Sequence, residues 1–119
     1  MKIGGGRLGD FGDWDAFALR DLDAAHEAAG GLYHEFLRAP ALSMGLYVLA
    51  PGSTDPQRPH DEDEVYHVVS GRAVLNVNGT DTRVGPGSIV YVAAETPHHF
   101  HSIETELRVL VFFAPAETG

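Results

Sequence analysis

Short stretches in which apolar and polar residues alternate follow one another along most of the chain, and turn-forming residues separate them. Glycine or proline stands at most of the boundaries, and Asn78-Gly79 is a dipeptide typical of a tight hairpin turn. Alternation with a period of two predicts β-strands with one buried face. We expect strands at residues 32–37, 42–50, 64–70, 72–77, 80–84, 88–93, 97–101 and 107–114.

The N-terminal part of the chain has a different pattern. We expect a Gly- and Asp-rich arm over residues 1–16 and a short edge strand over residues 17–22. Asp23 is placed to cap a short helix over residues 24–29, and Gly30 is a typical helix stop. The sequence predicts no other helix.

The last predicted strand is apolar on both faces. Its two faces carry Val109 and Val111 on one side and Leu110 and Phe112 on the other. One face would fill the interior of a β-sandwich or barrel. The other face needs a cover, which a second sheet layer or a second subunit would supply. We therefore expect a single all-β domain, and we expect it to form a homodimer.

Charge and composition exclude several classes of partner and site. The 119 residues include 8 lysines and arginines, 17 aspartates and glutamates and no cysteine, which gives a formal net charge of −9. This charge argues against a nucleic acid or an anionic membrane as a partner, because both are bound through clustered basic residues. Without cysteine there is no disulfide, zinc–thiolate site or thiol nucleophile. No apolar stretch reaches the ~18 residues of a membrane span, and the N-terminus lacks a secretory signal, so we expect a cytoplasmic protein.

Candidate metal ligands lie around the strand that is predicted to begin at residue 64. His60 and Glu64 are four residues apart, so both side chains point to one face of an extended strand. A third candidate, His98, follows a later apolar stretch and would join them from a distant strand. Two imidazoles and one carboxylate suit a divalent transition metal with open coordination positions, and non-heme Fe(II) is the best-known occupant of such a site.

Alternation separates the other histidines of these segments from the candidate site. His67, His99 and His101 have the opposite parity and are expected to face away from the metal. The acidic residues 61–63 are expected to form a solvated rim that attracts a cation.

Two segments resemble the paired motifs of the cupin superfamily. Residues 52–71 keep the spacing of the first motif, G-x5-H-x-H-x3/4-E-x6-G, and residues 87–102 keep that of the second, G-x5-P-x-G-x2-H-x3-N. The positions that the motifs give to metal ligands hold Arg58, His60, Glu64 and His98. The resemblance implies an all-β double-stranded β-helix (jelly-roll) barrel over residues 32–114. An arm with one short helix would precede it at residues 1–31, and a short polar tail would follow at 115–119.

The chain departs from these motifs in ways that affect the ligand set. Ala93, Glu95 and Ser102 replace the Pro, Gly and Asn of the second motif, and the loss of the Pro and the Gly changes only a turn. Arg58 replaces the first metal-binding histidine, so a site of three histidines and one glutamate does not carry over. The ligands that the resemblance does carry over are His60, Glu64 and His98. The carbonyl oxygen of the adjacent Gln57 is a candidate replacement for the missing imidazole.

The resemblance implies a metal-dependent enzyme that acts on a small organic molecule. We favour a non-heme Fe(II)-type dioxygenase, because two histidines and one carboxylate leave positions for both substrate and O2. Mn, Ni, Cu, Co and Zn also suit the ligand set. A metal-dependent isomerase, epimerase or lyase is an alternative. A non-catalytic cupin that binds a small ligand is another, and the loss of the first histidine favours it.

Two further residues are candidates for a catalytic role. The guanidinium of Arg58 would hold a carboxylate, phosphate or enolate group of the substrate, or it would pair with an acidic residue of 61–63 or with Glu64. Tyr66 has the same parity as Glu64 and is expected to lie deeper in the barrel. There it would donate a hydrogen bond to a ligand, act as a general acid, or pack in the core.

Overall fold

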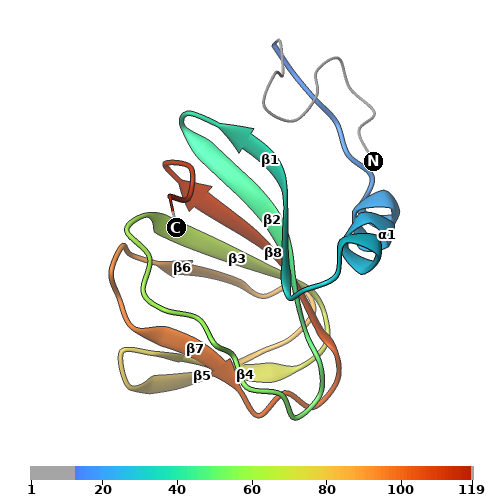
Figure 1. Ribbon diagram of the computed structural model, residues 1–119. Helices are drawn as coiled ribbons and strands as arrows, with labels where there is room; N and C mark the ends of the chain where they lie inside the picture. Colours follow the sequence, from blue (N-terminus) through green and yellow to red (C-terminus); the bar gives the residue numbers. More distant parts are fainter. Residues whose placement is uncertain (1–12, 119) are drawn as a thin grey trace.

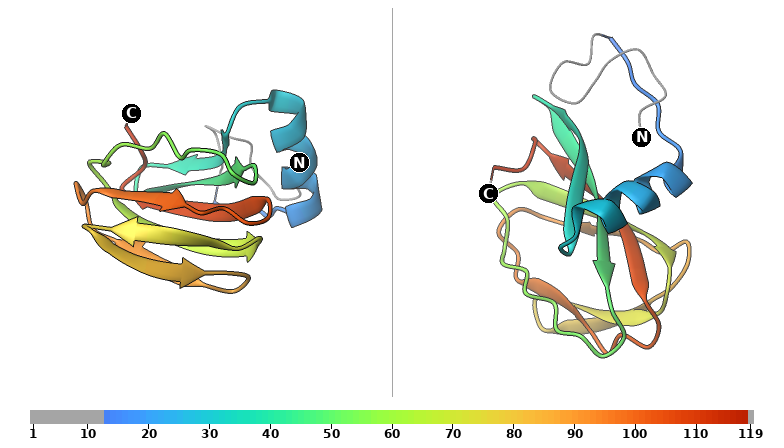
Figure 2. Two further views of the ribbon diagram at one scale, coloured as in Figure 1. Left: turned by 90° about the horizontal axis from the view of Figure 1, so that it is seen from below. Right: turned by 45° about the vertical axis from the view of Figure 1, so that its right-hand side comes forward.

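The computed structural model describes residues 13–118 and consists of two antiparallel β-sheets and one helix (Figure 1). The elements are α1 (Leu19–Ala29), β1 (Tyr33–Ala39), β2 (Leu42–Leu49), β3 (Asp63–Ser70), β4 (Ala73–Val77), β5 (Thr80–Val84), β6 (Ile89–Val92), β7 (His98–His101) and β8 (Leu107–Ala114). The larger sheet has the strand order β1-β2-β8-β3-β6, and the smaller sheet has the order β5-β4-β7. The two sheets face each other (Figure 2), which confirms the predicted all-β architecture with one helix. Residues 1–12 of the predicted arm lie outside the described range.

Helix α1 replaces the edge strand that was predicted over residues 17–22. The helix begins at Leu19 and lies against the outside of the larger sheet, beside β1 (Figure 1). Leu22 is its buried residue and packs with Phe36 of β1 and Leu46 of β2. The strand prediction was wrong because the helix buries one apolar stripe on the sheet, and this long-range packing decides between two local conformations of a short apolar segment.

Of the two helix ends that the sequence predicted, only the C-terminal end of α1 agrees with the structure. Ala18 is the N-cap and makes no side-chain capping bond. Asp23, which was predicted as the cap, lies inside the helix and pairs with Arg108 of β8. Gly30 ends the helix with φ 74°, as predicted for a glycine stop. Among the described residues, no helix is long and apolar enough to cross a membrane.

The core lies between the two sheets and takes side chains from both. Tyr66 and Val68 of β3, Leu75 of β4 and Val109 of β8 are fully buried there, and Phe100 of β7 is 1% exposed. Burying one such side chain contributes about 1.5–3 kcal/mol to folding. The strands therefore hold their alternate residues inward, and the registers of the strands that carry the candidate ligands are fixed by this core.

Two turns with positive φ values lie at the ends of β4. Asn78 and Gly79 have φ values of 53° and 90° and join β4 to β5, which confirms the predicted hairpin. Gly71 joins β3 to β4 with φ 91°, and a Cβ there would lie 2.2 Å from the carbonyl oxygen of Glu106. Only glycine fits this position. On its other side β4 pairs with β7, and Val77 of β4 lies opposite His98, the first residue of β7.

Candidate metal site

Three of the predicted ligands come together at one end of the barrel. His60 lies in the loop between β2 and β3, Glu64 is the second residue of β3, and His98 is the first residue of β7. Ligand atoms of the three side chains all lie within 4.8 Å of one another. Glu64 is 2% exposed and His98 is 5% exposed. A buried carboxylate between two imidazoles is a suitable donor set for a divalent transition metal.

One ring nitrogen of His98 faces Glu64, and the other is held by a backbone carbonyl group. Its Nδ1 lies 2.8 Å from the carbonyl oxygen of Thr96, and its Nε2 lies 3.0 Å from Oε1 of Glu64. Burial lowers the pKa of His98, but the hydrogen bonds to Glu64 and Thr96 and the charge of Glu64 raise it overall. The Nε2 to Oε1 separation also suits two ligands of one metal, because bonds of ~2.1 Å at a right angle place ligand atoms ~3 Å apart.

Two buried polar atoms of the same cluster have no hydrogen-bond partner within residues 13–118. They are Nε2 of His60 and Oε2 of Glu64. Leaving a buried polar atom without a partner costs about 1–3 kcal/mol, so two such atoms in one cluster call for a physical explanation. A cation that accepts both lone pairs supplies one. The residues present therefore fit a bound metal ion.

The C-terminal tail contributes a side chain that the sequence did not indicate. Oε2 of Glu117 lies 3.1 Å from Nδ1 of His60, and this hydrogen bond is the main reason that the pKa of His60 is raised. The tail was predicted only to be short and polar. Its carboxylate reaches the site because the chain turns back after β8, and no local periodicity marks such a contact.

Glu62 also departs from the sequence prediction. The acidic residues 61–63 were expected to be solvated, but Glu62 is 4% exposed and its carboxylate accepts hydrogen bonds from the backbone and hydroxyl groups of Thr118. Asp61 and Asp63 are exposed. The prediction failed at the middle residue because the tail, which is distant in sequence, folds over the bend before β3 and covers that side chain.

Gln57 and Tyr66 are joined beside the metal ligands. The hydroxyl of Tyr66 donates to Oε1 of Gln57 at 2.7 Å and lies 3.0 Å from Nε2 of His98. The Gln57 oxygen that was predicted as a fourth ligand thus accepts one hydrogen bond, from Tyr66. Tyr66 is fully buried, and burial followed by the charge of Glu64 raises its pKa well above the ordinary value. It remains a protonated hydrogen-bond donor at neutral pH, next to the cluster.

Asp55 organises the loop that carries Gln57 and His60, and sequence reasoning gave it no role. Its carboxylate is buried and accepts hydrogen bonds from the Tyr47 hydroxyl, the side-chain and backbone amides of Gln57, and the backbone N–H of Phe100. Two features of the sequence could have pointed to Asp55: it stands directly before Pro56, and it lies three residues before the first histidine position of the motif. These bonds hold the loop, which connects β2 to β3, against strands β2 and β7.

Arg58 does not reach the site. Its side chain is exposed and is not among the residues that line the adjoining cavity. Within the described part of the chain it forms no ion pair, so the predicted pairing with an acid of residues 61–63 or with Glu64 is not observed. The predicted role of its guanidinium as a substrate anchor has no support in this arrangement.

The other histidines follow the predicted parity. Along β7 the side chains of His98 and Phe100 are buried, whereas His99 is exposed and His101 is partly exposed. His101 pairs with Asp81 of β5 at 2.9 Å. The four-residue sequence HHFH therefore supplies one side chain to the cluster.

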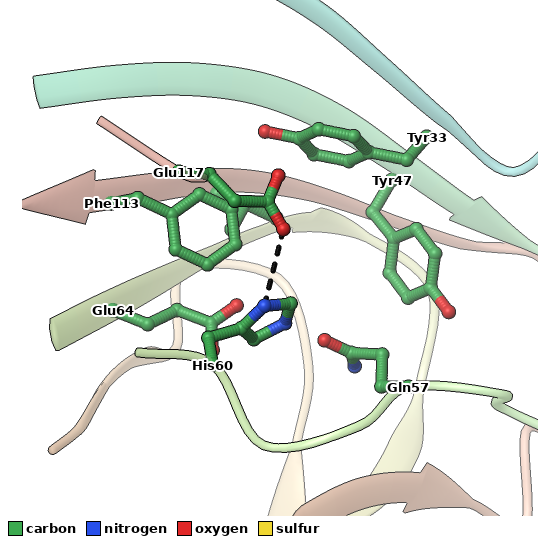
Figure 3. A pocket seen from close by; sticks show the side chains of 8 residues that line it. Tyr33, Tyr47, Gln57, His60, Glu64, Phe113 and Glu117 are labelled. Carbon is green, nitrogen blue, oxygen red and sulfur yellow. Dashed lines mark ion pairs between the residues drawn. The ribbon is translucent and has the colours of Figure 1, made fainter. Parts of the chain in front are cut away.

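A cavity of about 120 Å³ adjoins the cluster (Figure 3). It is lined by Tyr33, Tyr47, Gln57, His60, Glu64, Val111, Phe113 and Glu117. Most of its wall is aromatic or aliphatic, and neither lysine nor arginine is among these described lining residues. The hydroxyl of Tyr33 is buried without a hydrogen-bond partner in residues 13–118, and burial is the main cause that raises its pKa. The cavity thus offers a free protonated donor opposite two carboxylates.

Comparison with known proteins identifies a family and a relative that match most of the chain. The family model described as Cupin domain matches residues 45–114. An uncharacterized protein of Streptomyces coelicolor is 52% identical over 103 residues, which are 87% of this chain and 98% of that protein.

Solved structures show similarity of fold at low sequence identity. An RmlC-like cupin of Methanocaldococcus jannaschii with a double-stranded β-helix fold has a TM-score of 0.65 and 19% identity, covering 71% of this chain and 79% of that one. A protein of Thermotoga maritima named as a predicted oxalate decarboxylase has a TM-score of 0.61 and 21% identity, covering 70% and 78%. The predicted double-stranded β-helix is thereby confirmed.

Proposed function

Because the chain belongs to the cupin domain family, we propose that the protein is a metal-dependent enzyme that acts on a small organic molecule. His60, Glu64 and His98 would hold one divalent transition metal. The observation that carries the proposal is the convergence of two partnerless buried atoms, Nε2 of His60 and Oε2 of Glu64, with the His98–Glu64 contact. Each of these atoms has a lone pair, and a cation would satisfy them together.

We favour Fe(II) as the metal and a dioxygenase as the class of enzyme. Two imidazoles and one carboxylate are typical of non-heme iron sites, although Mn, Ni, Cu, Co and Zn suit the same donors. When bound, the metal would polarise an oxygen of the substrate and, if it is iron, activate O2. A dioxygenase reaction places both atoms of O2 in the product and needs no external reductant, so it would require no cofactor besides the metal.

The wall of the cavity favours an uncharged substrate that carries oxygen. Glu64 and Glu117 would repel a carboxylate or a phosphate, and no lysine or arginine of the described chain lines the cavity to compensate. The Tyr33 hydroxyl would donate a hydrogen bond to a carbonyl or enol oxygen. Phe113 and Tyr47 would bury the carbon skeleton and exclude water. Small diketones and enols are the molecules of this kind to test first.

A protein that binds a small ligand without turnover is the second candidate. The observation that favours it is the contact of 3.0 Å between His98 and Glu64, together with the raised pKa of His98. An imidazolium–carboxylate pair without a metal would have the same two properties. In that case the cavity would hold its ligand through the Tyr33 hydroxyl and apolar contacts, with no ion. Metal content separates the two candidates.

The first experiment is a measurement of metal content by ICP-MS on protein that is purified without a His tag. We expect a transition metal at close to one equivalent in the wild type, and its loss in His60→Ala, Glu64→Ala and His98→Ala. His99→Ala, which changes an exposed histidine next to His98, is the matched control and should keep the metal. Wild-type protein without metal after anaerobic reconstitution would sink the enzyme proposal and favour the binding protein.

Oxygen consumption then tests the reaction class. Protein loaded with Fe(II) should consume O2 in the presence of a small diketone or enol, and the His98→Ala variant should not. Conversion of such a compound without O2 uptake would instead point to an isomerase, epimerase or lyase; the similarity of fold to a named oxalate decarboxylase makes lyase substrates part of that screen.

A further inference from the structure

We propose that Glu117 of the C-terminal tail is a positioning residue for the metal ligand His60. In this role its carboxylate accepts a hydrogen bond from Nδ1–H of the imidazole, so that the lone pair of Nε2 is directed toward Glu64 and His98. The inference rests on the proposed metal site, and it assigns to the tail a part in that site which the two cupin motifs do not contain.

The hydrogen bond between the two side chains fixes which nitrogen is free. Oε2 of Glu117 lies 3.1 Å from Nδ1 of His60, and a carboxylate at this distance needs a proton on the nitrogen. A neutral imidazole carries only one proton, so Nε2 then has a lone pair. That same Nε2 is buried and has no hydrogen-bond partner in residues 13–118. The free lone pair is therefore on the nitrogen that a metal would use.

His98 shows the same arrangement with a different outer partner. Its Nδ1 lies 2.8 Å from the carbonyl oxygen of Thr96, and its Nε2 faces Glu64. Metal-bound histidines usually donate their second N–H to a carbonyl or carboxylate, which fixes the tautomer and the direction of the ring. His98 finds this acceptor in the backbone of the loop just before β7. Within residues 13–118, the acceptor for His60 is Glu117 of the tail.

The tail is held so that the Glu117 carboxylate is in place before a metal binds. The backbone N–H of Glu117 lies 3.0 Å from the hydroxyl of the buried Ser43, and Arg38 donates to its carbonyl oxygen at 2.7 Å. One residue later, Thr118 is bound by the buried Glu62 through two hydrogen bonds. The carboxylate therefore has little freedom to leave the imidazole.

His60 needs this support because it does not lie on a strand. It belongs to the irregular loop between β2 and β3, and its side chain is 17% exposed. Phe113 packs against the ring at a centroid distance of 4.8 Å and an angle of 63°, which limits its tilt. An apolar ring cannot choose between the two tautomers, whereas the carboxylate can (Figure 3). The two contacts together fix the direction of the ring and its proton.

Binding of Zn(II) to the metal-free protein, followed by isothermal titration calorimetry, tests the inference. We expect Glu117→Ala to weaken binding about 10- to 100-fold, the range typical for loss of such an outer partner. Glu117→Gln keeps an acceptor oxygen without the charge and should fall between the wild type and Glu117→Ala. Glu104→Ala removes an exposed carboxylate that takes no part in the proposed site, and it should stay within about threefold of the wild type.

The tautomer gives a second readout that a merely structural role of the tail would not move. In Zn(II)-loaded wild type, long-range 1H–15N NMR should place the metal on Nε2 and the proton on Nδ1 of His60. Metal on Nδ1, or equal affinity of the wild type and Glu117→Ala, would overturn the inference and leave the metal site standing. A wild type that binds no Zn(II), while remaining folded, would overturn the metal site and this inference with it.

Discussion

At the scale of single residues, the cavity depends on a contact between a glycine and an aromatic ring. Tyr33 of β1 pairs in register with Tyr47 of β2, and Gly45 lies two residues before Tyr47 on the same face. A Cβ at Gly45 would lie 2.1 Å from Cζ of Tyr33 and 2.2 Å from its hydroxyl oxygen. The missing side chain of Gly45 is therefore what lets the Tyr33 ring lie over the strand and point its hydroxyl into the cavity.

Gly45→Ala should force the Tyr33 ring out of this position. We expect a loss of about 1–3 kcal/mol in the free energy of unfolding, the usual cost of overpacking. In a Tyr33→Ala background the same change should be neutral or stabilise by up to about 1 kcal/mol, because alanine has less conformational freedom than glycine in the unfolded chain. Urea unfolding of the four proteins measures the coupling. Equal costs in both backgrounds would mean that Tyr33 does not occupy this space.

The sequence could identify some residues of the site but not others, and distance along the chain explains the difference. His60 and Glu64 were identified by a spacing of four on a segment expected to be extended, although His60 lies in the loop before β3, and His98 was identified by its place after a second apolar stretch. Glu117 and Asp55 act on groups that are distant in sequence: Asp55 binds the backbone of Phe100, 45 residues away. Such contacts depend on how the sheets close, which no local pattern encodes.

At the scale of elements, the loop between β2 and β3 is an ordered segment although it has no regular secondary structure. The Asp55 carboxylate takes hydrogen bonds from β2 through Tyr47, from β7 through Phe100, and from its own loop through Gln57. Buried donors that would otherwise be unpaired meet at one acceptor. The loop thereby carries His60 on a fixed base.

Replacement of Asp55 tests this view of the loop. Asp55→Ala leaves several buried donors without an acceptor, and we expect it to lower the free energy of unfolding by about 2–4 kcal/mol. Asp61→Ala changes an exposed acid of the same loop and should stay within about 0.5 kcal/mol of the wild type. Urea unfolding with a common slope gives both values. Equal stability of the two variants would show that the Asp55 bonds do not hold the loop.

The elements themselves were predicted well where local rules dominate and poorly where packing decides. The strand ends agree with the predicted bounds to within two residues, because glycine or proline follows most of the strands and stops them by backbone geometry. The segment over residues 17–22 is the exception. It is short and apolar, and only its contact with Phe36 and Leu46 selects helix over strand. Tertiary packing of this kind overrides local preference.

At the scale of the whole molecule, residues 13–118 cover the outer face of the larger sheet on one side only. Helix α1 packs Leu22 over β1 and β2, so a helix supplies part of the second layer that the apolar strands required. The other side ends in the edge strand β6, where Ile89 is 71% exposed and Tyr91 is 62% exposed. These two side chains lie next to each other on the outward face of that strand.

The predicted homodimer remains a prediction, and β6 gives it a location. If a second copy of the chain covers Ile89 and Tyr91, the wild type should sediment as a dimer in analytical ultracentrifugation at micromolar concentration. The double variant Ile89→Glu/Tyr91→Glu should shift to monomer, because association would bury unpaired carboxylates at the new interface. Thr82→Glu, on exposed β5, adds charge without touching β6 and should leave the dimer intact. A wild type that sediments as monomer at every concentration would rule the dimer out, and a dimer that survives the double variant would place its interface on another face.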